Sequence, residues 1–344
     1  MTAEPSKNHT ARSIGKPAPP SHPLVHRVSI AVTVIFLTVF IIVPVVNVFS
    51  QALAKGFHAY ATTFVAQPRS MSPGLTRDER RQLSSERRQV EKTWHAIKLT
   101  ATVAVVVVGL NIIFGLAASW SVTKFPLKGR SLLLALIDLP FSVSPVIAGL
   151  MFVLLFGRSG IFGHWASNLT WPDPFSLQWL GLANGWPGFQ FTQYYSGIIF
   201  TPLAILAASI FVTFPFVARS LIPLMEAQGS DEEIAALSLG ASGWRIFWTV
   251  TIPNVRWALL YGVILCTARV FGEFGAVSVV SGHTDGNDTM ALRIEKLWNE
   301  YNTQAAFSVA SLLSLLALIT LIIQTVIEWR LLKASNVAIK KDAP

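Results

Sequence analysis

The sequence predicts an all-α integral membrane protein with six transmembrane helices. Of its 344 residues, 52% are hydrophobic and only 13% are charged, whereas a soluble domain carries about 25% charged residues. The apolar residues are gathered into runs close to the roughly 20 residues that a spanning helix needs. These runs lack the sustained alternation of strands, and backbone groups in lipid must bond within their own segment. We therefore interpret the runs as helices.

Six runs meet the length requirement, and they define a membrane domain over residues 28–330. They are Val28 to about Phe49, Leu99–Val122, Ser131–Phe156, Ser196–Ala218, Trp257–Gly282 and Ala305–Ile327. Residues 1–27 are polar and rich in proline and serine, so we expect a disordered tail there, and residues 331–344 form a second tail. The first run is longer than the core of a signal peptide, which favours a retained span.

An even number of spans places both termini on the same side of the membrane. If the termini are cytoplasmic, both tails, the short loop Lys124–Arg130 and the segment 219–256 carry their basic residues inward, as the positive-inside rule expects. The arginine-rich segment Arg77–Lys92 would then face outward, which argues against this orientation. Acidic residues count little in that rule and longer loops can translocate despite their charge. We therefore predict that both termini are cytoplasmic.

Two outer segments have unusual compositions. The first, Arg77–Lys92 ("RDERRQLSSERRQVEK"), is expected to be a solvated or interfacial helix. The second, Gly157–Tyr195, is dense in tryptophan, glycine and proline. We expect its tryptophans at the level of the lipid headgroups, with docking of an external partner as the alternative. Cationic loops at a membrane surface explain the formal charge of +9 without a nucleic-acid partner.

The chain carries no recognisable catalytic motif. The phosphate loop GxxxxGK[ST] and the patterns GxGxxG, HExxH and GxSxG are all absent from the sequence. Its histidines lack metal-ligand spacing, and the single cysteine, Cys266, lies in an apolar run where packing is its expected role. We predict no catalytic residue, no metal site and no bound cofactor. Any nucleotide energy would have to come from another chain.

A half-polar segment, residues 230–253, separates the fourth and fifth runs. Ser230 followed three residues later by Glu233 is the pattern of a capping box, which predicts the start of a short helix. Asp231 and Glu232 lie in the first turn, where the helix dipole favours anions. Gly240 is the expected end of this helix, since glycine commonly follows a helix C-terminus.

A second short helix is expected over about Ser242–Thr249, with three aromatic residues before Pro253 ends it. Together the two helices would lie against the membrane face. The small surface of Ala235 and Ala236 is suited to a groove on a partner protein. Physical reasoning alone leaves two interpretations open: a connector that returns the chain to the membrane, or a docking lever.

The spacing of this segment resembles the EAA loop of ABC-importer permeases. The matching positions are Ala235, Ala236, Gly240, Val250, Ile252 and Pro253. One position departs, because Ile234 stands where the family has a glutamate and Glu233 comes one residue earlier. The resemblance implies that the loop docks into a cleft on a separate ATPase subunit. The residues implied in coupling are Asp231, Glu232, Glu233, Ala235, Ala236, Gly240 and Pro253.

Longer stretches, covering most of residues 28–330, resemble the W-type permease subunit of sulfate/thiosulfate ABC importers, within the MetI-like permeases. They are "DLPFSVSPVIAGL" (138–150), "LGASGW" (239–244), "PNVRWALLYGV" (253–263) and "GEFGAVSVVSG" (272–282). The resemblance implies a six-helix type I importer permease in the bacterial inner membrane. It also implies a second permease, two ATP-binding subunits that hold ATP-Mg, and a periplasmic sulfate-binding protein. Both outer segments look like insertions relative to this family.

Four residues are candidates for the translocation pathway or its gate. Arg269 lies inside the fifth run, and Glu273 follows four residues later on the same expected helical face. Arg269 either attracts the anion, or forms a clasp with Glu273 that makes the helix insertable; we favour the clasp. Ser142 and Ser144 lie beside the prolines of the third run and could offer hydroxyl donors, although local backbone satisfaction is the favoured role.

Three rival functions remain open at this point. The stretch 272–282 is shared with molybdate-type permeases, so import of molybdate, tungstate or another small oxyanion is the nearest alternative. An ion-coupled secondary carrier should show paired broken helices or internal repeats, and no repeat is evident in the sequence. A membrane scaffold is disfavoured by the charged residues Arg269 and Glu273 within a span.

Overall fold

The structure is a computed structural model that describes residues 23–65, 76–126, 128–168, 170–171, 195–284 and 286–341. Its contacts divide the chain into two units, Met1–Ser50 and Gln51–Pro344. Most of the sequence-predicted tail, residues 1–22, and residues 172–194 of the second outer segment lie outside the described residues.

The described part of the first unit is one long helix. It comprises α1 (Pro23–Leu37), the π-helical turn η1 (Thr38–Ile42) and most of α2 (Val43–Leu53). The stretch Val25–Leu53 is long and apolar enough to cross a membrane. The expected first span is therefore confirmed, beginning a few residues earlier than Val28.

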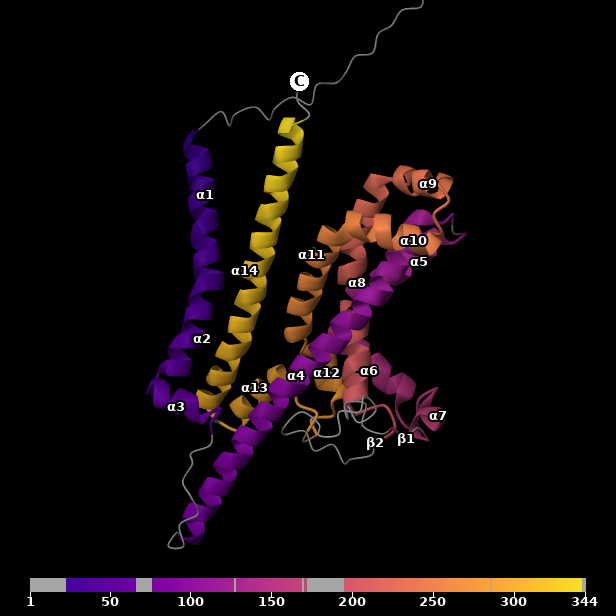
Figure 1. Cartoon of the computed structure of the whole chain (residues 1–344). Coiled ribbons are helices and arrows are strands. Elements are labelled where there is room, and N and C mark those ends of the chain that lie inside the picture. The colour runs from indigo at the N-terminus through magenta and orange to yellow at the C-terminus, as the bar shows by residue number, and fades with distance from the viewer. Residues whose placement is uncertain are drawn as a thin grey trace, which may run out of the picture. The chain divides into compact units, whose positions relative to one another are not determined.

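The second unit is almost entirely helical (Figure 1). Its helices are α3 (Gly56–Thr62), α4 (Arg77–Lys124), α5 (Arg130–Ser142), α6 (Pro145–Phe156), α7 (Gly163–Ser167), α8 (Pro202–Gln228), α9 (Asp231–Ser238), α10 (Gly243–Ile246), the π-helical turn η3 (Phe247–Thr251), α11 (Ile252–Phe271), α12 (Gly275–Val280), α13 (Met290–Asn299) and α14 (Thr303–Lys341). Two short strands, β1 (Thr170–Trp171) and β2 (Tyr195–Ser196), pair antiparallel.

Helices α4, α8 and α11 form the core of this unit. Glycines allow the helices to approach closely: a Cβ on Gly115 would lie 2.8 Å from the Cβ of Val217, as small residues permit at membrane helix crossings. A polar contact joins the same three helices, because the Asn111 side-chain amide donates to the Thr213 hydroxyl at 2.7 Å and to the sulfur of Cys266 at 3.4 Å. The expected packing role of Cys266 is confirmed by its complete burial.

The count of spans agrees with the sequence, but one span is broken. Among the described residues, five helical segments are long and apolar enough to cross a membrane, and α5 with α6 makes a sixth if the pair is one span. The run Ser131–Phe156 is not one continuous helix, because α5 and α6 are bent by 107° beside the prolines of this run. Pro145 causes the break: it lacks a donor and pushes Ser144 to an extended ψ of 136°.

The arginine-rich segment is part of the second span rather than a separate helix. Helix α4 has 48 residues and begins at a capping box formed by Thr76 and Glu79. At 1.5 Å per residue it is about 72 Å long, more than twice the roughly 30 Å of a bilayer core. Arg77–Lys92 therefore extends the helix well beyond its apolar part.

The fifth span also differs from its expected bounds. Helix α11 stops at Phe271, and after a short link the separate helix α12 follows. At its other end the span is longer than expected, because α10, η3 and α11 form one segment, Gly243–Phe271. Pro253 does not end a helix. It lies at the start of α11, where a missing donor is tolerated, directly after the π-helical turn.

The remaining boundaries shift moderately. Helix α8 spans Pro202–Gln228, so the fourth span begins and ends later than the expected Ser196–Ala218. The expected sixth span is confirmed over Thr303–Ile327, and α14 continues as helix to Lys341 through most of the sequence-predicted tail.

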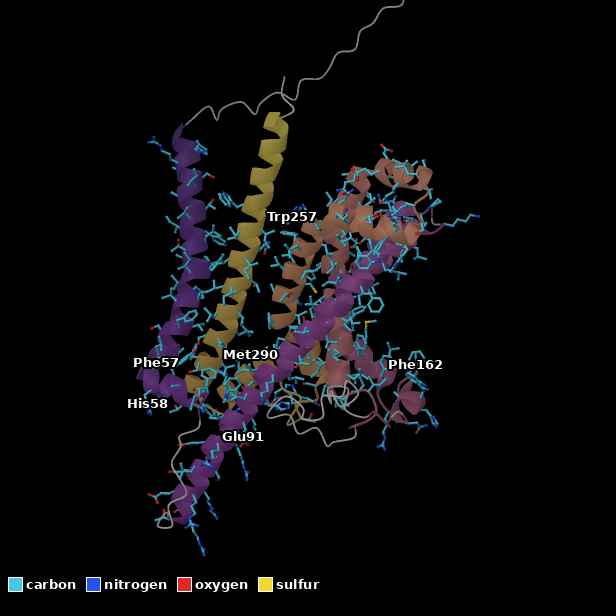
Figure 2. All side chains as sticks on the ribbon, viewed as in Figure 1. Phe57, His58, Glu91, Phe162, Trp257 and Met290 are labelled. Carbon is cyan, nitrogen blue, oxygen red and sulfur yellow. The ribbon has the colours of Figure 1, made fainter. Side chains whose placement is uncertain are left out.

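The second unit has two distinct ends. We call the end formed by α9, α10 and the last turn of α4 the α9 end, and the end formed by α7, α12 and α13 the α13 end (Figure 1). Trp257, early in α11, and Met290, at the start of α13, lie toward these opposite ends (Figure 2). Each long helix of the core connects the two ends.

Candidate functional site

Helix α9 begins where the sequence predicts, but without the predicted capping box. The Ser230 side chain makes no capping hydrogen bond. The Glu233 carboxylate instead pairs with Lys124 Nζ at 2.7 Å and accepts a hydrogen bond from Thr251 Oγ1 at 2.9 Å. A bond to a charged donor is stronger than one to a neutral backbone amide, which explains why Glu233 turns to Lys124. The acidic first turn remains, with Asp231 and Glu232 as expected.

Gly240 ends α9 as predicted. Its φ is +83°, a left-handed conformation that glycine adopts without the steric cost of a Cβ. The Gly240 amide donates to the Leu237 carbonyl at 2.9 Å and the Ala241 amide to the Ala236 carbonyl at 3.1 Å. This pair of bonds is the Schellman motif. No atom lies within 4 Å of a Cβ built on Gly240, so its backbone conformation, not space, restricts substitution.

Side-chain contacts fasten α9 to the spans on either side. Glu233 ties it to the last residue of α4, and Glu232 accepts a hydrogen bond from the Asn254 amide at the start of α11. The Gln228 side chain, at the end of α8, donates to the Asn254 carbonyl at 3.3 Å. Between these residues lies a cavity of about 20 Å³, room for a single water. A force applied to α9 therefore reaches α4 and α11 directly, and α8 through α11 and the chain itself.

The outer surface of the α9 end is apolar. Ala235 is exposed and Ala236 half-buried. Around them lies a set of exposed large side chains, which we call the α9 patch: Ile234, Leu237, Leu239, Trp244 and Trp248. The sequence reasoning missed most of this patch, although the spacing of Ile234 and Leu237 on one helical face could have indicated it. Exposed apolar patches of this kind mark interaction surfaces.

A second candidate site lies where two helices break. The start of α12 packs against the start of α6: a Cβ on Gly275 would lie 3.0 Å from the Cβ of Pro145, and one on Gly149 would lie 2.7 Å from the Ala276 carbonyl oxygen. The break at residues 143–144 and the link at residues 272–274 are therefore neighbours. We call this region the break junction.

Arg269 and Glu273 form an ion pair at the break junction, with Arg269 Nη2 and Glu273 Oε2 2.8 Å apart. The two residues do not share a helix, contrary to expectation. Arg269 is in the last turn of α11, and Glu273 is in the link, where its other oxygen accepts a hydrogen bond from the Ala276 amide at 2.9 Å. The Glu273 side chain is 1% exposed and that of Arg269 is 30% exposed. Glu273 thus also caps α12, a role that the sequence did not indicate.

Ser142 and Ser144 are both exposed, one at the end of α5 and the other in the break. Ser142 belongs to a row of small or polar residues that recur on one helical face of α5: Ser131, Ala135, Asp138 and Ser142. We call this row the α5 stripe. Beside it runs an exposed apolar row, Leu132, Leu136 and Leu139. Pro145, the residue after Ser144, packs against Gly275, which follows Glu273 by two residues, so the structure brings the two predicted segments together.

Asp138, in the middle of the α5 stripe, pairs with Arg219 of α8 at 2.9 Å between Oδ1 and Nε. The carboxylate inside the third run thus has a basic partner on another helix. The guanidinium also stacks over the Phe141 ring, with Cζ 4.7 Å from the ring centroid. Across the described residues, no group of three or more histidine, cysteine or acidic side chains could hold a metal ion.

Membrane-spanning helices, a broken span, buried charge at that break and a loop fastened to three spans together define an integral membrane transport subunit. The comparison with known families makes this specific. The chain belongs to the family of binding-protein-dependent transport system inner membrane components, which matches residues 95–333.

Relatives in this family resemble the chain over most of its length. It is 47% identical over 238 residues to the sulfate transport system permease protein CysW of Escherichia coli (strain K12), which covers 69% of this chain and 73% of the relative. It is 33% identical over 227 residues to the sulfate transport system permease protein CysT of the same strain, covering 66% of this chain and 73% of that relative. The chain is thus closer to the W-type protein.

The fold matches a solved importer. The crystal structure of a bacterial alginate ABC transporter in complex with an alginate pentasaccharide-bound periplasmic protein contains a chain that aligns with a TM-score of 0.61. The alignment covers 88% of this chain and 92% of the other at 15% sequence identity. At this identity the likeness concerns the fold alone, and it confirms the expected bundle of an ABC-importer permease.

Proposed function

We propose that this chain is a transmembrane permease subunit of an ATP-driven importer of sulfate and thiosulfate. The observation that carries the proposal is the 47% identity to a sulfate permease protein over 238 residues. These sulfate permease relatives do not favour the alternative substrates, molybdate and tungstate. The chain has no nucleotide-binding motif, so ATP-Mg would be bound by partner subunits.

The proposed assembly contains this chain, a second related permease, two ATP-binding subunits and a periplasmic sulfate-binding protein. Two differently named sulfate permeases resemble the chain at different levels, which supports a pair of related permeases. The periplasmic protein in the alginate transporter complex supports a soluble partner that delivers the anion. The α9 end would face the cytoplasm, as would both termini, in the inner membrane of a bacterium.

The proposed coupling step uses the α9 patch as the docking surface for an ATP-binding subunit. Its apolar side chains would be removed from water on docking, which is favourable in proportion to the area buried. The carboxylates of Glu232 and Glu233 then pass movement of α9 to α11 and α4. The small side chains of Ala235 and Ala236 let the partner's surface come close. Gly240 sets the angle between α9 and α10, and Pro253 lies at the start of α11.

The proposed pathway follows the α5 stripe and the break junction. Ser142 and Ser144 would offer hydroxyl donors to an oxyanion beside the break. The Arg269–Glu273 pair would act chiefly as a clasp, because a carboxylate that is 1% exposed is costly to leave unpaired. A guanidinium shared with a carboxylate binds an anion weakly, and weak binding lets the solute leave.

Uptake by a strain that lacks its own W-type permease tests the proposal. With this chain expressed in that strain, we expect radiolabelled sulfate to accumulate, and excess unlabelled thiosulfate to compete. Labelled molybdate serves as the comparison anion. Normal abundance of the chain in the membrane without sulfate uptake, or uptake of molybdate alone, would overturn the proposal.

A further inference from the structure

Arg219 has an unusual position on the most buried helix. From Thr201 to Ile222, a stretch that the structure describes throughout, Arg219 is the only exposed residue. Its side chain is 53% exposed and that of its partner Asp138 is 46% exposed. Within this stretch, Arg219 is therefore the one residue of α8 whose side chain reaches the surface.

Both members of the pair lie within segments long and apolar enough to cross a membrane, Arg219 in α8 and Asp138 in the α5–α6 pair. Helix α8 has 27 residues, about 40 Å at 1.5 Å per residue, so about 5 Å of it extends past each side of a roughly 30 Å hydrocarbon core. Arg219 precedes the end of α8 by about 14 Å, so in a span centred on the core it would lie about 8 Å inside the hydrocarbon. An exposed charged pair at this depth faces a water-filled cavity or another protein, not lipid.

The charge of Asp138 and the hydroxyls of Ser131 and Ser142 give the α5 stripe the polar groups that line a water-filled cavity. Asp138 shares that face of α5 with Ser131, Ala135 and Ser142, all small or polar. The adjacent leucine row offers the apolar surface that lipid or a second permease would cover. We therefore assign the α5 stripe to water and call it the wet face, and we call the leucine row the dry face. The ion pair with Asp138 brings Arg219 of α8 to the wet face.

We propose that Arg219 binds the transported divalent oxyanion in the half of the pathway near the α9 end, with Asp138 as its counter-charge. This inference rests on the proposed function, since it concerns the same anion. A guanidinium has five N–H donors, and its planar fork suits oxyanions. The ion pair uses Nε of Arg219, so the Nη donors are the ones that would hold the anion.

Arg219 suits this role better than Arg269. Glu273 is sealed from water and caps α12 as well as pairing with Arg269, so an anion could not displace it without disrupting a helix. Asp138 has no such second task among its recorded contacts, and both members of its pair are half-exposed. The Asp138 carboxylate would hold Arg219 between transport events. Once the anion has bound, the carboxylate would repel it, which shortens the time that the anion stays bound.

Cysteine labelling of the complete transporter in proteoliposomes tests this proposal. The only cysteine of this chain, Cys266, is buried, so in a Cys266→Ala parent the introduced thiol is the only one in this chain, and labelling is read on this chain after the subunits are separated by electrophoresis. In that parent, Asp138→Cys places a thiol beside Arg219, and an anionic methanethiosulfonate reagent reports its access to water. We expect rapid labelling that saturating sulfate slows markedly. Adding Arg219→Gln should slow the reagent about tenfold, because a cationic site concentrates anions, and should abolish the protection by sulfate.

Matched variants keep the outcome decisive. Leu136→Cys, on the dry face of the same helix, should stay unlabelled, and Ser142→Cys on the α5 stripe replaces Asp138→Cys if that variant is absent from the membrane. Labelling that is unaffected by sulfate and by Arg219→Gln, in a parent that takes up sulfate normally, overturns the role of Arg219 alone. A parent without sulfate uptake overturns the proposed function itself.

Discussion

Lys124, the last residue of α4, and Glu233, in the first turn of α9, form an ion pair of 2.7 Å whose side chains are only 10% and 17% exposed. The pair joins the end of a membrane-spanning helix to the loop that follows another span. In the proposed function this contact carries movement from the ATP-binding subunits into the bundle.

The Lys124–Glu233 pair gives the first prediction. Lys124→Met leaves a largely buried carboxylate unpaired, which we expect to cost about 2 kcal/mol of stability, less than for a fully buried pair. Sulfate uptake should fall strongly while ATP hydrolysis by the assembled transporter continues, because movement of α9 is no longer passed to α4. Lys128→Met, which removes an exposed lysine four residues later, is the matched control and should leave uptake unchanged. Equal loss in both variants would refute the specific role of the pair.

A second prediction concerns Gly240. Any side chain at this position must adopt a φ of +83°, at a cost of about 1–2 kcal/mol, and the Schellman motif at the end of α9 should loosen. Gly240→Val should therefore reduce uptake severalfold while the protein remains in the membrane at normal abundance.

The control for this prediction is Gly243→Ala. Gly243 starts α10, its φ is not positive, and open space surrounds it, so alanine should be neutral or slightly stabilising there. Uptake by Gly240→Val equal to that of Gly243→Ala would remove the α9 lever from the proposed coupling step.

The α9 patch gives a third prediction. Leu239 is 89% exposed, so Leu239→Ser should leave the fold intact. If the patch docks an ATP-binding subunit, losing this apolar contact should cost about 2 kcal/mol of affinity, roughly 30-fold. Co-purification of the ATP-binding subunits in mild detergent measures this loss. Ile161→Ser, which changes an equally exposed apolar residue at the α13 end, should retain them.

The lengths of the apolar runs were sufficient to predict the spans, because a bilayer imposes a minimum length on every helix that crosses it. They could not locate the breaks. The bend after Ser142 depends on Pro145, yet Pro140 lies inside α5 without ending it, so proline alone does not identify a break. Likewise the π-helical turn before α11 makes Pro253 compatible with a continuous segment.

The candidate sites were predictable only where a local pattern determines the geometry. Gly240 has a local role at a helix end, and the structure agrees with it. The pairing of Glu233 with Lys124 joins residues distant in sequence, and no spacing rule could indicate it. The predicted capping box failed for the same reason, since a tertiary partner competed for the Glu233 carboxylate and won.

The last prediction separates a clasp from an anion site at Arg269. Arg269→Ala leaves the Glu273 carboxylate buried and without its cation, at a cost of about 3–5 kcal/mol, so membrane abundance and uptake should both fall. The double variant Arg269→Ala/Glu273→Gln removes the stranded charge, and glutamine can still accept the hydrogen bond from the Ala276 amide. A clasp therefore predicts that the double variant recovers abundance and much of the uptake. If Arg269 instead binds the anion, abundance recovers but uptake stays as low as in the single variant, and quantitative immunoblotting beside the sulfate assay distinguishes the two.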